Sequence, residues 1–143
     1  MNLSNNGRII IIDDRHDEAI PLINFLYNKG LPCVYYTGDQ DKLPENSLTG
    51  VRFVFLDVVL DGLEGSEEIT PENISLYLIS ILIKIIDKNN GPYFIIFWTK
   101  HEDIINKVLQ YCDKAEIPPT SYISLDKKKY YGDNYENLAD DID

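Results

Sequence analysis

Charged and hydroxyl side chains follow directly on the apolar runs of this sequence. Asp13 and Asp14 come after four isoleucines, Asp57 ends the run VRFVFLD, Thr99 follows FIIFW, and Lys127 comes soon after the last run. Carboxylates brought close together repel one another and stay ionised near neutral pH when a cation joins them. Oxygen ligands of this kind suit Mg²⁺. A carboxylate nucleophile, a metal ion and donors for phosphoryl oxygens are together the parts needed to transfer a phosphoryl group to a carboxylate.

These groups can meet only if the apolar runs are neighbouring strands of one sheet. The runs are apolar on both faces, which is typical of parallel strands covered by helices on both sides. Strands that alternate with helices predict an α/β fold with right-handed crossovers. In the strand order 2-1-3-4-5, the carboxyl ends of strands 1, 3, 4 and 5 line one crevice. The expected strands are Arg8–Ile12, Cys33–Thr37, Val51–Asp57, Tyr93–Trp98 and Ser121–Leu125, and the expected helices are Asp17–Lys29, Pro71–Lys88 and His101–Ala115.

Apolar residues at helical spacing mark the inward faces of two expected helices, and in one of them they form a second stripe. In the first helix, Ile20, Ile23 and Tyr27 are predicted to form the inward face, with Leu22 and Leu26 beside them. In the helix from Pro71, a second stripe is formed by Leu76, Ile79 and Ile83. Either another part of this chain covers that stripe, or it is the interface with a second copy or another partner.

Length and composition limit the class of protein. The 143 residues correspond to one domain, and 44% of them are hydrophobic and 26% charged, which is typical of a globular protein. We expect residues 1–130 to form the domain and residues 131–143 to be an acidic tail or a linker towards a downstream domain. A net charge of −11 argues against a nucleic-acid-binding surface. The isolated Cys33 and Cys112 indicate free thiols in a reducing compartment. The sequence contains neither a signal peptide nor an apolar run long enough for a membrane span, so we expect a cytoplasmic location and no membrane contact.

Three stretches together resemble the receiver domain of two-component response regulators. They are RIIIIDD, VRFVFLDVVLDG and FIIFWT, followed by a strand with a basic end, and the resemblance covers roughly Arg8–Lys129. The double acid followed about 43 positions later by a strand-terminal Asp is its most specific feature. The resemblance implies a doubly wound, flavodoxin-like fold, Mg²⁺ as cofactor, and phosphoryl transfer from a histidine kinase or phosphotransfer protein. It also implies that the chain is not an enzyme beyond transfer to its own Asp.

Site roles follow from the resemblance residue by residue. Asp57 would be the phosphoacceptor, and it would hold the metal together with Asp13, Asp14 and the backbone carbonyl of Val59. Thr99 would be the switch hydroxyl, which moves towards the phosphoryl group, and Lys127 would be the lysine that the family has at the end of the fifth strand. From the residues alone, Thr99 could instead cap the following helix. Lys127 could likewise belong to a solvated charge run, and the choice between Lys127 and Lys128 stays open.

The sequence also departs from the usual receiver pattern. Asp61 stands where the family has Pro, Lys100 where it has a small residue, and the second helix looks shortened while a full fifth helix is not evident. We therefore predict a divergent receiver that signals to an output domain or partner protein and could form a homodimer through the helix from Pro71 or the face of strands 4 and 5. The alternative is a pseudo-receiver that binds proteins without being phosphorylated. A haloacid-dehalogenase-like phosphatase is disfavoured, because the general-acid position two residues after the nucleophile holds Val59 after Asp57 and Arg15 after Asp13.

Overall fold

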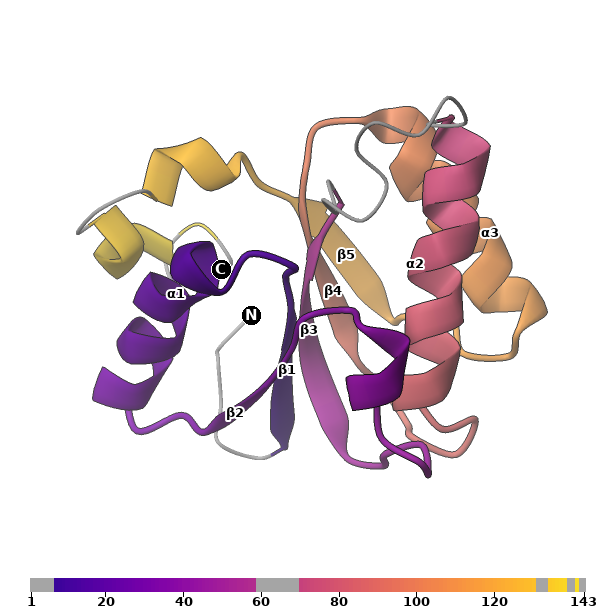
Figure 1. Cartoon of the computed structure of the whole chain (residues 1–143), viewed down its shortest axis with the longest axis horizontal. Helices are drawn as coiled ribbons and strands as arrows, with labels where there is room; N and C mark the ends of the chain where they lie inside the picture. Colours follow the sequence, from indigo (N-terminus) through magenta and orange to yellow (C-terminus); the bar gives the residue numbers. More distant parts are fainter. Residues whose placement is uncertain (1–6, 59–69, 131–133, 139–140, 142–143) are drawn as a thin grey trace.

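The five strands form one parallel sheet in the order β2-β1-β3-β4-β5 (Figure 1). The computed structural model describes residues 7–58, 70–130, 134–138 and 141. Its strands are β1 (Arg8–Ile12), β2 (Cys33–Tyr36), β3 (Val51–Asp57), β4 (Phe94–Trp98) and β5 (Ser121–Ser124). Every neighbouring pair is parallel. The predicted α/β class and strand order are confirmed.

Helices cover both faces of the sheet. Figure 1 places α1 (His16–Asn28) on one face, and α2 (Pro71–Ile85) and α3 (Glu102–Lys114) on the other. Between β2 and β3 the helical structure is the single 3-10 turn η1 (Gln40–Lys42). Among the residues described after β5, it consists of η3 (Lys127–Tyr130), η4 (Asn134–Asn137) and the helical residues Leu138 and Asp141. The shortened second helix and the reduced fifth helix are therefore confirmed. No helix in the described residues is both long and apolar enough to cross a membrane.

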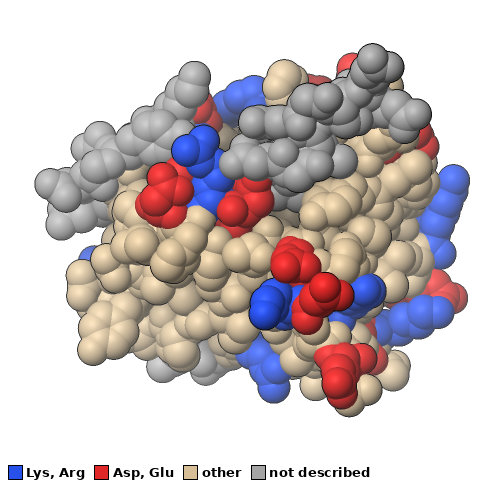
Figure 2. All heavy atoms as spheres, in the orientation of Figure 1, with Lys and Arg blue, Asp and Glu red and all other residues tan. Residues whose placement is uncertain are grey.

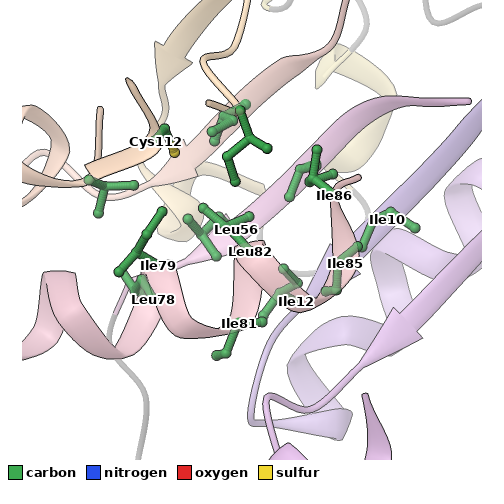
Figure 3. Close-up of a cluster of buried hydrophobic side chains, with 14 of the residues drawn as sticks. Ile10, Ile12, Leu56, Leu78, Ile79, Ile81, Leu82, Ile85, Ile86 and Cys112 are labelled. Atoms are coloured by element: carbon green, nitrogen blue, oxygen red, sulfur yellow. The ribbon is translucent and has the colours of Figure 1, made fainter. Parts of the chain in front are cut away.

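Successive strand residues point to opposite faces, so the sheet supports two separate cores. Ile10, Ile12 and Leu56 lie in the core under α2 and α3, together with Leu78, Ile81, Leu82 and Ile85 of α2 (Figure 3). Ile9, Ile11, Phe53 and Phe55 lie in the core under α1. Burying one such side chain contributes about 1.5–3 kcal/mol. Apolar burial on both faces thus holds β1 and β3 in the centre of the sheet, where they position Asp13 and Asp57.

The second stripe of α2 is covered in part by α3. Ile79 is 6% exposed, whereas Leu76 and Ile83 are 44% and 50% exposed. A polar contact also joins the two helices, because Glu72 accepts hydrogen bonds from Lys107 Nζ at 2.8 Å and from the Tyr111 hydroxyl. This chain therefore buries the centre of the stripe and leaves its two ends exposed.

The predicted inward face of α1 is wrong for Ile20 and Tyr27, which are 40% and 79% exposed. The buried residues of α1 are Ala19, Leu22, Phe25 and Leu26. The helix carries two overlapping apolar stripes, and the one that docks includes Phe25, whose ring packs against Tyr135 from the C-terminal segment. The surface of α1 and β2 is accordingly mostly uncharged on the side seen in Figure 2.

The C-terminal segment contributes side chains to the core beneath α1. Tyr130, Tyr135 and Leu138 are buried there. The ring of Tyr130 lies edge-on to Trp98 with centroids 5.5 Å apart, and Tyr135 lies 5.8 Å from Tyr130. Side chains beyond residue 130 therefore cover part of the sheet that a fifth helix would otherwise cover.

Leu138→Ala is expected to lower the free energy of unfolding by about 2–4 kcal/mol, because it removes a fully buried side chain. Urea denaturation followed by circular dichroism measures this change. Leu76→Ala is the matched control, since Leu76 is 44% exposed and its loss should cost about 1 kcal/mol or less. Equal effects of the two variants would show that residue 138 is not part of the cooperative core.

Candidate functional site

The side chains selected from the sequence gather at the carboxyl edge of the sheet. Asp57 is the last residue of β3, Asp13 follows β1, Thr99 follows β4, and Lys127 begins η3 just after β5. The strand registers pair Ile12 with Leu56 and Trp98 with Asp57. Asp13 directly follows Ile12, and Thr99 directly follows Trp98, so both lie beside the end of β3. Asp13, Asp57, Thr99 and Lys127 are all buried.

Three carboxylates form the centre of this site. One oxygen from each of Asp13, Asp14 and Asp57 lies within 4.8 Å of the others. A set of carboxylate oxygens is the donor chemistry of a hard divalent cation such as Mg²⁺ or Ca²⁺. The residues present therefore fit the expected metal. Val59, expected to add a backbone carbonyl, and Asp61, which replaces the usual Pro, lie outside the described residues.

Lys127 brings a positive charge to the same cluster. Its ammonium contacts Asp13 Oδ2 at short range, donates to Glu18 Oε2 at 2.8 Å, and lies 3.9 Å from Asp57 Oδ2. Lys127 is thus part of a buried ion cluster rather than of a solvated charge run. Its ammonium is also close enough to Asp57 to bind an oxygen of a group attached there.

Burial has the largest effect on the pKa of Asp57. It raises the pKa of Asp57 to about 8; Lys127 opposes this rise, and Asp13 and Asp14 add to it. For Lys127, burial alone would lower the pKa, but the carboxylates of Asp57, Asp13 and Glu18 raise it above its usual value. The ammonium therefore stays charged, while the Asp57 carboxyl, with its raised pKa, is mostly protonated near neutral pH. A cation bound by the three carboxylates would favour the ionised form of Asp57.

The Thr99 hydroxyl is engaged in the turn that leads into α3. Its Oγ1 accepts a hydrogen bond from the His101 backbone N–H at 3.1 Å. A hydroxyl can accept and donate at the same time, so this turn contact is compatible with donation to a group on Asp57. The neighbouring Lys100 reaches the other way, towards β5, where its Nζ donates to the Ser124 carbonyl at 3.3 Å.

Two residues of this region were not predicted from the sequence. Glu18, in the first turn of α1, binds Lys127. Tyr35 on β2 donates its hydroxyl to the Asp13 carbonyl at 2.6 Å, and burial, with smaller effects of Asp13 and Asp14, raises its pKa to about 12. Selecting only strand-terminal residues overlooked both. A helix that starts at the carboxyl edge also places its first turn there, and this rule would have found Glu18.

Comparison with known proteins gives matches among solved structures. No family model matches the chain, and no curated protein matches its sequence. A response regulator from Thermotoga maritima is 15% identical, with 96% of this chain and 94% of that chain covered and a TM-score of 0.46. A response regulator from Burkholderia pseudomallei, solved with a phosphorylated aspartic acid, a calcium ion and citrate, is 11% identical, with 95% and 70% covered and a TM-score of 0.48. A chain from the crystal structure of the CheA3 P1 domain in complex with CheY6 from R. sphaeroides is 13% identical. The match covers 97% of this chain and 95% of that chain, with a TM-score of 0.49. These structures are similar to the chain at low sequence identity.

Proposed function

We propose that this chain is a phosphoacceptor receiver domain of a two-component or phosphorelay system, with Asp57 as the residue that is phosphorylated. The observation that carries the proposal is the cluster of Asp13, Asp14 and Asp57, with Lys127 3.9 Å from Asp57 Oδ2. A buried carboxylate at this edge of an α/β sheet, with two more carboxylates and an ammonium around it, has the groups that the transfer needs.

In the proposed reaction, the ionised carboxylate of Asp57 attacks the phosphorus of a phosphohistidine on a histidine kinase or phosphotransfer protein. A bond forms between an Asp57 oxygen and phosphorus, the bond from phosphorus to the imidazole nitrogen breaks, and that nitrogen keeps the electron pair and takes up a proton. Mg²⁺, when bound by Asp13, Asp14 and Asp57, would supply positive charge to the phosphoryl oxygens. Lys127 binds a further phosphoryl oxygen, and the protein acts on no other substrate.

Phosphorylation of Asp57 would then change the surface of the protein through a movement of Thr99. A phosphoryl group offers strong acceptor oxygens to the Thr99 hydroxyl. Movement of this hydroxyl towards Asp57 would stretch or break the bond that it accepts from the His101 N–H, directly before α3 begins. The proposed output face therefore consists of β4, α3 and β5.

Partners follow from the same proposal. A kinase or phosphotransfer protein would meet the chain in the cytoplasm, and the signal would pass to a downstream domain or a separate protein. Two surfaces are available for that partner or for a second copy of the chain: the ends of the α2 stripe at Leu76 and Ile83, and the output face. The proposal includes no contact with nucleic acid or with a membrane.

One observation favours the phosphorylation-independent pseudo-receiver as the second candidate. Lys127 already neutralises part of the acidic cluster by its contacts with Asp13 and Glu18. A site that is held together by its own lysine could serve only to maintain the fold. The two candidates differ in whether Asp57 takes up a phosphoryl group.

Incubation with acetyl phosphate and Mg²⁺ is expected to add the mass of one phosphoryl group to the intact protein, as measured by mass spectrometry. Asp57→Asn should abolish the increase, because no nucleophilic carboxylate remains at that position. Asp17→Asn is the matched control, since its side chain is 77% exposed, and it should be phosphorylated like the unaltered protein. No mass increase, or one that persists in Asp57→Asn, would contradict the proposed function and favour the pseudo-receiver.

A further inference from the structure

Glu18 lies outside the three-carboxylate cluster and yet binds the lysine of that cluster. Its Oε2 accepts from Lys127 Nζ at 2.8 Å, while its Oε1 lies 3.7 Å from Arg15 Nε. The side chain is 24% exposed, compared with 3% for Asp13 and 8% for Asp57. Glu18 therefore sits at the rim of the site, where water can reach it and where a second cation, Arg15, helps to hold it.

Lys127 and a divalent cation require the same carboxylate. The ammonium contacts Asp13 Oδ2, and Asp13 is also one of the three residues whose oxygens could bind the cation. Two positive charges cannot share one buried carboxylate without a cost, because charges repel strongly where water is excluded. A divalent cation bound at Asp13 would therefore compete with the ammonium for this carboxylate.

On the basis of the proposed function, we propose that Glu18 is a positioning residue. It holds the Lys127 ammonium when a divalent cation binds Asp13, Asp14 and Asp57. Glu18 already accepts from the ammonium, so a small displacement away from Asp13 leaves Lys127 with a carboxylate partner. Among the residues that the structure describes, the other carboxylates paired with Lys127, at up to 3.9 Å, are Asp13 and Asp57, which are themselves the proposed ligands of the cation. Without Glu18, Lys127 would compete with the cation for both.

A double-mutant cycle on Mg²⁺ affinity tests this role. Trp98 is the only tryptophan, is 5% exposed and pairs with Asp57 in the sheet, so its fluorescence reports on the site. Glu18→Gln is expected to weaken Mg²⁺ binding by about fivefold to tenfold, and Lys127→Met to strengthen it. In the Lys127→Met background, Glu18→Gln should change the affinity by about twofold or less, because the lysine it positions is gone.

Asp17→Asn is the control for the loss of one negative charge. Asp17 precedes Glu18, is 77% exposed and pairs with Arg15, so its loss should change Mg²⁺ affinity by about twofold or less. An equal loss of affinity from Glu18→Gln with and without Lys127 would overturn the inference, since Glu18 would then act by its charge alone.

A second measurement does not depend on the Lys127→Met variant folding. In the protein saturated with Mg²⁺, the ammonium hydrogens of Lys127 should exchange slowly with water, as followed by NMR of ¹⁵N-lysine-labelled protein, and Glu18→Gln should make this exchange fast. If the ammonium hydrogens of Lys127 exchange as slowly in a folded Glu18→Gln protein as in the unaltered one, the positioning role would be overturned. Failure of the proposed function is distinguishable, because the cycle would then behave as expected while acetyl phosphate adds no mass. If Mg²⁺ does not change the Trp98 fluorescence of the unaltered protein, both the proposed function and the positioning role of Glu18 would be overturned.

Discussion

Asp57→Asn is expected to stabilise the metal-free protein by roughly 2–4 kcal/mol at pH 8, the largest gain we predict for any single substitution. Burial raises the pKa of Asp57 from 3.8 to about 8. The folded state therefore holds a proton on this carboxyl over a pH range in which the unfolded chain has released it. The stability that this proton contributes is complete below about pH 4 and is lost as the pH rises through 8. Asparagine carries no such group, so the advantage of the variant should grow between pH 4 and pH 8 and then level off.

Urea denaturation in EDTA at pH 5, 6, 7 and 8 measures this difference. Asp17→Asn, which removes an exposed carboxylate, should differ from the unaltered protein by about 0.5 kcal/mol or less at every pH. Mg²⁺ should stabilise the unaltered protein, because a ligand that binds only the folded state shifts the equilibrium towards it, and should stabilise Asp57→Asn much less. Identical stability of Asp57→Asn and the unaltered protein across this pH range would mean that Asp57 is ionised in the fold without cost.

The sheet and most of the site could be predicted from the sequence because strand ends are visible in it. Apolar runs such as RIIII and VRFVFLD end abruptly at Asp13 and Asp57, and parallel strands bring those ends to one edge. The strand order then places Thr99 and Lys127 beside them. These predictions depend on the apolar runs, on the direction of the strands and on the strand order of a doubly wound sheet.

Contacts that depend on helix rotation could not be predicted in the same way. In α1, the sequence offers one stripe with Ile20 and Tyr27 and another with Leu22 and Phe25, and periodicity alone does not choose between them. The stripe that docks packs in the core of the sheet and against Tyr135, which lies more than a hundred positions away in the chain. Glu18 was missed for a different reason, because the selection was restricted to strand-terminal residues and left out the first turn of α1, from which Glu18 binds Lys127.

Lys127→Met is expected to have the opposite effect to Asp57→Asn and to lower the free energy of unfolding in EDTA at pH 8 by about 3 kcal/mol. Removing the ammonium leaves Asp13, Glu18 and Asp57 without the cation that they share, and an unpaired buried carboxylate is costly. Urea denaturation measures the loss. Lys129→Met is the control, because Lys129 is 60% exposed and its ion pair with Asp141 should contribute about 1 kcal/mol or less.

Addition of Mg²⁺ is the sharper part of this prediction. If the three carboxylates bind the ion, Mg²⁺ replaces the missing positive charge and should restore most of the stability lost in Lys127→Met. It should leave the small loss in Lys129→Met unchanged, since Asp141 is not part of the cluster. Adding Asp57→Asn to Lys127→Met should likewise reduce the loss in EDTA, because one of the carboxylates left unpaired is removed. A loss that neither Mg²⁺ nor Asp57→Asn reduces would mean that Lys127 contributes through the packing of its aliphatic chain rather than through its charge.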